Sequence, residues 1–304
     1  MPNQTAALIK PTLADLDSLL ALSAAAHWNQ TRDDWAWMLA HGRTRALCEH
    51  NTLVASTLVL PWPAIATQPS HSNAASLAWI SMVLVLPEHR GKGHATRLLE
   101  ESLAWLREPA QHHLLPVLDA TPAGRLVYLK LGFSDQWGFT RWEHRTHHRV
   151  SPDLHRHDLT APHDMARAAP VVHELDRLAF GADRSLLLDS LMRRAPSLAL
   201  VARSGEQAHG FLLARPGRVA TQVGPLVARD SDTAIELADQ ALSRIDGVVF
   251  IDIPDSQRKF ADWVASRGFV PQRPFTRMGL INPNQASPPA PPLAPFAVAG
   301  PELG

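Results

Sequence analysis

The turn at residues 87–95 has the residue types of a phosphate-binding loop. It follows the apolar segment 77–86 and reads Pro-Glu-His-Arg-Gly-Lys-Gly-His-Ala, and a helical pattern begins at once. Small residues let backbone N–H groups converge on phosphate oxygens, and the positive end of the following helix adds to the attraction. Apolar or small positions of that helix recur every three or four residues, so one face can pack on a sheet and hold the turn rigid. The spacing therefore predicts a preformed anion site made by Arg90, Gly91, Lys92, Gly93, His94 and Ala95, with Thr96 as the next residue of the helix.

A second chemically capable block follows this helix. The strand-like segment 114–118 leads to Asp119, and a short helical pattern then ends in Tyr128-Leu-Lys-Leu-Gly132-Phe133. Tyr128 is the only tyrosine of the chain. It could simply be a core side chain with its hydroxyl at the surface.

The order and spacing of the two blocks resemble the GNAT acyltransferases, whose acetyl-CoA loop has this arrangement of strand, R-G-x-G-x-A turn and helix. The resemblance implies acetyl-CoA as cosubstrate, with its pyrophosphate bound by residues 90–96. It also implies that the pantetheine arm pairs with backbone groups of Met82, Val83, Leu84 and Val85. The end of this strand would be splayed from the neighbouring strand and would polarise the thioester carbonyl. Tyr128 would lie beside the coenzyme sulfur and donate to the departing thiolate.

The general base that would deprotonate an amine stays open. The coenzyme strand offers Ser81 and no carboxylate, so a chain of water molecules could suffice. Asp119 is a second candidate. A carboxylate just before Thr121-Pro122 is equally well explained as a cap of the following helix.

The acceptor site is expected near residues 27–31, because the resemblance places it at the loop between the first two helices. Trp28 could wall off an acceptor while Asn29 and Gln30 hydrogen-bond to it. The alternative is a helix junction in which Trp28 is core and Thr31 is an N-cap. The matching loop of the second half adds Asp183 and Arg184, which could bind a zwitterion or pair with each other, and the motif 222–225, shared with tandem GNAT proteins, adds Gln222.

The second half of the chain looks like a degenerate copy of the first. Where the first has residues 90–95, the second has Asp230-Ser231-Asp232, whose carboxylates can cap a helix and would repel a phosphate. Four residues before each Gly-Phe pair, Tyr128 in the first half is replaced by Val264 in the second. We therefore expect one active centre per chain, in the first half.

The predicted fold class is α/β (α+β), with two tandem GNAT folds, each a mixed, mostly antiparallel twisted sheet flanked by helices. We expect a catalytic domain at 1–146, a linker at 147–166, a degenerate GNAT-like domain at 167–282, and a Pro-rich segment at 283–304 whose end is docked. In this alignment Asp119 corresponds to Asp252.

Composition excludes several classes of partner. The 29 basic and 29 acidic side chains cancel, so neither nucleic acid nor an anionic membrane is expected as a partner. No apolar run approaches the roughly 20 residues of a membrane helix, and the cytoplasm is the default location. The single Cys48 indicates a small buried side chain. The histidines at 144, 147, 148, 155, 157 and 163 are irregularly spaced, and we expect no metal.

The sequence therefore predicts an N-acyltransferase that transfers an acetyl group from acetyl-CoA to the amine of a small molecule by direct attack. Two alternatives remain open. One is a non-catalytic acyl-CoA sensor or interaction protein, and the other is a protein acetyltransferase.

Overall fold

The structure is a computed structural model that describes residues 6–64, 76–148, 158–160, 165–280 and 293–304. Most of the predicted linker, with His155, His157 and His163, and the Pro-rich start of the last segment lie outside the described residues. The elements of the first half are β1 (Ala7–Ile9), α1 (Leu16–Ala25), α2 (Arg32–His41), β2 (Arg43–Glu49), β3 (Thr52–Trp62), β4 (Ser76–Val85), α3 (His94–Leu106), β5 (Leu114–Ala120), α4 (Pro122–Lys130) and β6 (Ser134–His147).

The second half repeats this succession in part. Its elements are β7 (Asp158–Thr160), α5 (Met165–Phe180), α6 (Ser185–Arg194), β8 (Leu200–Ser204), β9 (Gln207–Arg215), β10 (Thr221–Ala228), α7 (Ser231–Leu242), β11 (Gly247–Pro254), α8 (Arg258–Ser266), β12 (Val270–Gly279) and β13 (Ala294–Ala297). Three 3-10 turns complete the described elements, at Leu13–Asp15, Pro87–His89 and Pro196–Leu198.

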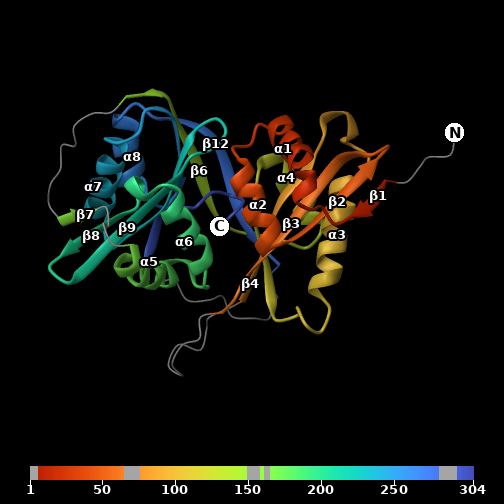
Figure 1. The fold of residues 1–304 in the computed structure, drawn as a ribbon, viewed down its shortest axis with the longest axis horizontal. Coiled ribbons are helices and arrows are strands. Elements are labelled where there is room, and N and C mark those ends of the chain that lie inside the picture. The colour runs from red at the N-terminus through yellow and green to blue at the C-terminus, as the bar shows by residue number, and fades with distance from the viewer. Residues whose placement is uncertain (1–5, 65–75, 149–157, 161–164, 281–292) are drawn as a thin grey trace.

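All described strands belong to one mixed sheet, in the order β1-β2-β3-β4-β5-β12-β6-β11-β10-β9-β8-β7, with β13 on β10. Only β4–β5 and β10–β11 are parallel among the described pairs. The predicted class, a mostly antiparallel mixed sheet flanked by helices, is confirmed (Figure 1).

The two halves exchange a strand at the centre of this sheet. Strand β12 of the second half lies between β5 and β6, and β6 of the first half lies between β12 and β11. The sequence had not singled out either strand. Because each half carries a strand of the other, the two predicted domains share one continuous sheet.

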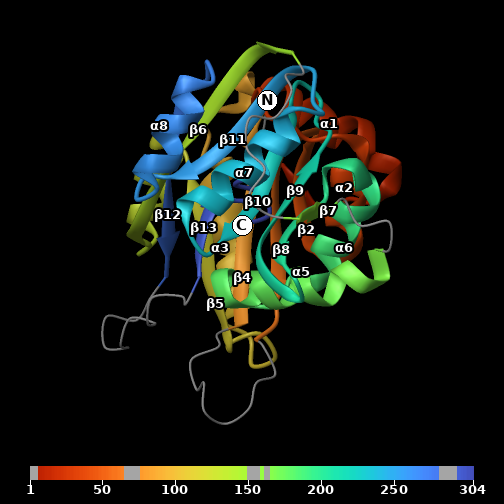
Figure 2. The same cartoon turned by 90° about the vertical axis from the view of Figure 1, so that its left-hand side faces the viewer.

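Helices cover both faces of the sheet. Helices α3 and α4 pack on one face of the sheet in the first half. Helices α7 and α8 pack on the sheet in the second half. Helices α1, α2, α5 and α6 lie together on one side of the molecule (Figure 2). Their side chains meet in one core cluster that includes Trp35 and Trp79, so the halves also share a core. The buried face of α3, at Leu98, Leu99, Ser102, Leu103 and Leu106, is the face that the sequence predicted.

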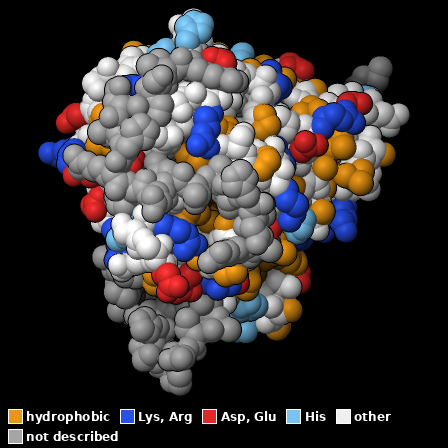
Figure 3. Space-filling view, turned by 60° about the vertical axis from the view of Figure 1, so that its left-hand side comes forward, with side chains coloured by type: hydrophobic (Ala, Val, Ile, Leu, Met, Phe, Trp, Pro, Cys, Tyr) orange, Lys and Arg blue, Asp and Glu red, His pale blue; other side chains and the backbone are white. Residues whose placement is uncertain are grey.

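The surface is mixed in charge. On the face drawn in Figure 3, acidic and basic side chains are interspersed. Among the described residues, none of the helices combines the length and the apolar character needed to cross a bilayer.

Candidate active site

Strand β4 is bulged where the pantetheine arm was predicted to bind. Ser81 pairs with Leu58 and Leu84 pairs with Ser56, so two residues of β4 oppose one residue of β3. Met82 has φ 50°, and the Ser56 hydroxyl donates to its carbonyl oxygen at 2.9 Å. A bulge of this kind bends the strand and redirects its backbone groups.

Strands β4 and β5 separate at this bulge. They pair only through residues 76–79 of β4 and 114–117 of β5, and β5 then pairs with β12. Residues 80–85 of β4 therefore have no strand partner on the β5 side among the described residues. Their N–H and C=O groups form a free edge, the kind of edge to which an extended ligand can add.

The turn after β4 leads directly into α3. Gly91 and Gly93 have φ values of 75° and 81°, which glycine adopts without steric cost. Gly93 is the N-cap of α3, and no side chain caps this helix. The first N–H groups of α3 are thus left for an anion. The predicted residues 90–96 lie together here, with Arg90 donating through Nε to the carbonyl of Val85 at 3.2 Å.

Tyr128 lies on α4, the helix that follows β5. It is 9% exposed and packs in a cluster with Ile80, Leu99 and Ala120, and its ring contacts Phe133 edge-on. Burial raises the pKa of the Tyr128 phenol above its usual 10.0. The phenol therefore stays protonated at neutral pH and can act as a donor.

Asp119 lies at the end of β5, but it neither caps α4 nor presents a free carboxylate. The cap of α4 is Thr121, whose hydroxyl accepts from the Gly124 N–H. Both Asp119 oxygens accept from the Arg277 guanidinium, at 2.9 and 3.0 Å. Burial raises the pKa of Asp119, and the charge of Arg277 opposes this shift. A raised pKa favours proton uptake, but both oxygens of this carboxylate are already engaged by Arg277.

Arg277 brings a residue of the second half to the end of β5. Its guanidinium lies 4.5 Å from the ring centroid of Trp79 and 4.3 Å from that of Trp137. None of these three residues was predicted from the sequence as a site residue. Their proximity depends on the placement of β12 beside β5, which no local pattern reveals.

The predicted acceptor residues are mostly engaged in contacts between the halves. The Asn29 amide accepts from the N–H groups of Val219 and Ala220 and donates to the Ala220 carbonyl. The carbonyl of Trp28 accepts from Arg218, and the Trp28 ring packs against the shared core. These residues fasten the loop between α1 and α2 to the loop between β9 and β10.

The candidates from the second half are paired as well. Asp183 accepts from Arg177 and Ser185, whereas Arg184 pairs with Asp176 and donates to the carbonyl of Gly304. Of the two alternatives for Asp183 and Arg184, the pairing with each other is not observed, because each pairs with another residue. Gln222 donates to Asp252, which also binds Arg141.

Two polar groups remain available near these contacts. Gln30 is 1% exposed and Ser81 is 7% exposed, and neither Gln30 Oε1 nor Ser81 Oγ has a hydrogen-bond partner among the described residues. Ser81 follows Trp79 by two positions, so both side chains face the α1 and α2 side of the sheet. A buried polar atom without a protein partner is a position for water or a substrate.

A cavity of about 340 Å³ lies beside the predicted acceptor loop, lined by Ala24, His27, Glu143, Arg218, Val219, Val248, Phe250, Gln272 and Arg273. On β12, Gln272 lies four residues before Thr276, and Thr276 pairs with Ala120 at the end of β5. At about 3.3 Å per residue, that is roughly 13 Å from the splayed strands. This cavity is therefore separate from the reacting centre.

The equivalent unit of the second half is closed. The carboxylate of Asp230 accepts from the Thr233 N–H and caps α7, as the sequence predicted. Strand β10 pairs with β11 only over residues 221–223, and beyond that point β13 pairs with residues 226–228. The last segment of the chain thus lies on the edge that corresponds to the free edge of β4.

Two family models match the chain. The acetyltransferase (GNAT) family model matches residues 14–133, and a second acetyltransferase (GNAT) domain model matches residues 172–288. Among curated proteins, the chain is similar to the uncharacterized N-acetyltransferase YitH of Bacillus subtilis (strain 168). That match has 25% identity over 64% of this chain and 66% of the relative.

Solved structures share the fold along the whole chain. A proposed acetyltransferase from Pyrococcus horikoshii has a TM-score of 0.73 and 18% identity, covering 100% of this chain and 98% of its own. A tandem GNAT protein from the clavulanic acid biosynthesis pathway has a TM-score of 0.63 and 14% identity, covering 90% of this chain and 97% of its own. At these identities the likeness concerns the fold alone.

Proposed function

Since this chain belongs to the GNAT acetyltransferase family and carries two GNAT domains in tandem, we propose that its first half transfers an acetyl group from acetyl-CoA to the amine of a small molecule. The observation that carries this proposal is the free edge of β4 beside the uncapped helix α3. An extended arm and a pyrophosphate at one end of it fit this pair of features.

The turn and the strand would bind the coenzyme in two ways. N–H groups at the start of α3, with Arg90 and Lys92, meet the phosphates, and each hydrogen bond to a charged group is worth about 1.5–3 kcal/mol. The backbone of residues 82–85 pairs with the pantetheine arm. The bulge at Met82 directs an N–H group at the thioester oxygen, where negative charge develops as the amine attacks.

The reaction requires few side chains. The amine nitrogen attacks the thioester carbon, the C–S bond breaks, and the departing thiolate takes the proton of Tyr128. A water molecule held by Ser81 takes the proton of the amine and passes it to solvent, and Tyr128 regains a proton from solvent. Holding the two reactants in line contributes roughly 7 kcal/mol or more, which exceeds the contribution of one acid or base. Asp119 was a candidate base from the sequence. In this scheme it takes no part in proton transfer and holds Arg277 in position.

The occlusion of the α1 and α2 face favours a small acceptor. The Trp79 Nε1–H donates to the carbonyl of Pro301 at 3.1 Å, and Ala299 and Leu303 of the same segment are buried in the core cluster of this face. A folded protein would have to displace this segment to bring a lysine to β4. A small amine needs only the space near Gln30 and Ser81.

The test is a screen of amino acids, polyamines and aminoglycosides for release of free coenzyme A, with acetyl-CoA binding measured separately by calorimetry. We expect binding and amine-dependent thiol release. Binding without release for any amine would support the acyl-CoA sensor, and acetylation of proteins in a lysate would support the protein acetyltransferase.

A further inference from the structure

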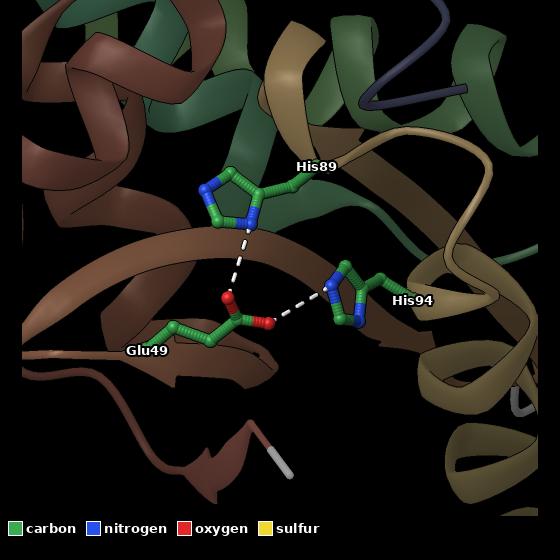
Figure 4. A group of neighbouring side chains, drawn as sticks. All are labelled: Glu49, His89 and His94. Atoms are coloured by element: carbon green, nitrogen blue, oxygen red, sulfur yellow. Dashed lines mark ion pairs between the residues drawn. The ribbon is translucent and has the colours of Figure 1, made fainter. Parts of the chain in front are cut away.

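Two histidines and a glutamate converge beside the phosphate-binding turn. The Glu49 carboxylate at the end of β2 contacts His89 Nδ1 at 3.2 Å through one oxygen and His94 Nε2 at 3.1 Å through the other (Figure 4). The three ligand atoms all lie within 4.8 Å of one another. The side chains are 19%, 18% and 10% exposed, so the cluster is largely buried and lies near the surface.

Neither contact is a good hydrogen bond. His89 Nδ1 and His94 Nε2 are both buried, and neither has a hydrogen-bond partner of acceptable geometry among the described residues. The two nitrogens thus face the carboxylate without pointing an N–H along a line to it. Buried polar atoms in native proteins are otherwise satisfied, so these nitrogens indicate a partner other than the carboxylate.

We propose that Glu49, His89 and His94 bind a divalent transition-metal ion, with Zn²⁺ as the best match. Two imidazoles and one carboxylate form an established zinc ligand set, and a water molecule completes the tetrahedron. Ligand atoms of a tetrahedral zinc lie about 3.4 Å apart, as the bond lengths of about 2.0–2.2 Å require. Each imidazole nitrogen lies near this separation from one Glu49 oxygen, and one atom from each residue lies within 4.8 Å of the others, so side-chain shifts of about 1 Å bring one oxygen and both nitrogens to these distances.

The position of this site gives the metal a role. His89 and His94 flank the four residues of the turn, and Glu49 ties them to the sheet. Because the turn contains two glycines with positive φ, it has conformational freedom that a coenzyme would have to restrict. Zinc holds both ends of the turn and so raises the affinity for acetyl-CoA. This second step depends on the proposed function, whereas the metal site does not.

The first experiment measures zinc alone. Metal-free protein is dialysed against buffered Zn²⁺, and we expect one equivalent per chain in the wild type and in the control His112→Ala/His113→Ala, which alters an exposed histidine pair on the same half. Glu49→Gln, His89→Ala and His94→Ala should each lower the zinc affinity by at least about 100-fold, since even partners outside the ligand shell are worth about 10- to 100-fold. Thermal melts without zinc verify that the variants fold. Equal zinc content in the wild type and in all three variants would overturn the site.

The second experiment measures acetyl-CoA affinity with and without one equivalent of zinc. We expect zinc to tighten binding by about 5- to 150-fold in the wild type, and acetyl-CoA to tighten zinc binding by the same factor. Glu49→Gln serves as the control for zinc bound by the coenzyme phosphates and should show no gain. If zinc binds and the acetyl-CoA affinity does not change, the coupling is wrong. If acetyl-CoA fails to bind in every condition, the proposed function fails and the zinc site stands.

Discussion

The two strand–turn–helix units of this protein start from the same plan and end in opposite states. In the first half, α3 begins at Gly93 with no side-chain cap. In the second half, the carboxylate of Asp230 accepts from the N–H of Thr233 and caps α7. One helix keeps its positive end for an external anion, whereas the other has filled it with an internal one.

The strands before these helices differ in the same way. Beyond its short pairing with β5, β4 keeps a free edge, whereas beyond its short pairing with β11, β10 is covered by β13. The N–H of Val298 then donates to the carbonyl of Asp252 at 3.0 Å. The last segment therefore takes in the second half the place that we assign to the pantetheine arm in the first. A binding edge has been converted into a structural one.

A third feature, a buried aspartate–arginine pair, is shared by both halves, which indicates a structural role for the pair. Asp119 on β5 pairs with Arg277 on β12, and the corresponding Asp252 on β11 pairs with Arg141 on β6. In each pair the arginine belongs to the strand donated by the other half. Because the pair also occurs in the half with the closed unit, it is explained by strand exchange and needs no catalytic function.

Breaking this shared pair should have the largest effect on stability. Arg277→Met leaves the buried Asp119 without its cationic partner, and Arg141→Met leaves the buried Asp252 with only the Gln222 amide, so each should lower the free energy of unfolding by about 3–5 kcal/mol. Urea denaturation measures both. The double variant Asp119→Leu/Arg277→Met replaces the pair with apolar side chains and should recover most of the loss. If that variant folds but no longer acetylates an amine, Asp119 is the base after all.

Removing the phenol should separate the two halves by activity. Tyr128→Phe deletes the proton donor and should lower kcat by about 100- to 10,000-fold with little change in acetyl-CoA affinity. The matched change in the second half, Val264→Ala, should affect stability and leave kcat within about twofold, because no chemistry is assigned there. Since burial raises the Tyr128 pKa above 10.0, the wild-type kcat should not fall with pH up to that value. A loss of kcat between pH 8 and 9 would contradict this assignment of the donor.

A carboxylate placed in the turn before α3 should make that turn resemble the turn before α7, which already carries Asp230. Gly93→Glu puts a carboxylate at the start of α3 and should weaken acetyl-CoA binding by about 100-fold or more, because the carboxylate repels the phosphates. Any side chain at this left-handed position costs roughly 1–2 kcal/mol. Gly205→Glu carries the same cost at another turn with positive φ and nothing near its Cβ position, so it is the control. Equal affinity in the two variants would place the phosphates elsewhere.

Local patterns predicted much of this comparison. The helical period of residues 94–106, the glycines of the turn and the carboxylates at 230–232 are each expressed within a few residues, so the sequence identified α3, its turn and the cap of α7. The fold class followed because the succession of elements in each half was also local. The roles of the coenzyme and acceptor residues remain predictions.

Features that depend on contacts between the halves could not be predicted. The apolar pattern of a strand does not say which neighbour it joins, so the exchange of β6 and β12 was missed, and with it the pairing of Asp119 with Arg277. From the sequence, Asn29 is recognisable only as a loop residue. Its hydrogen bonds to residues 219–220 depend on a segment that lies 190 residues away in the chain. Glu49 was missed for the same reason, since the turn that it contacts lies on another element.

Removing the cap of the closed unit should have the smallest effect. Asp230→Ala leaves the first N–H groups of α7 unpaired and should lower the free energy of unfolding by about 1 kcal/mol. The hydrogen bond from the Thr233 N–H lowers the pKa of Asp230 below its usual 3.8, so the cap stabilises the fold above that pH and the contribution is lost as pH falls through the lowered value. Chemical denaturation at pH 7 and at pH 2 should therefore show a difference between wild type and variant only at the higher pH. The uncapped helix should still bind no acetyl-CoA, because β13 continues to occupy the edge of β10, and a measurable affinity of this variant for a second acetyl-CoA would show that the carboxylate alone had closed the site.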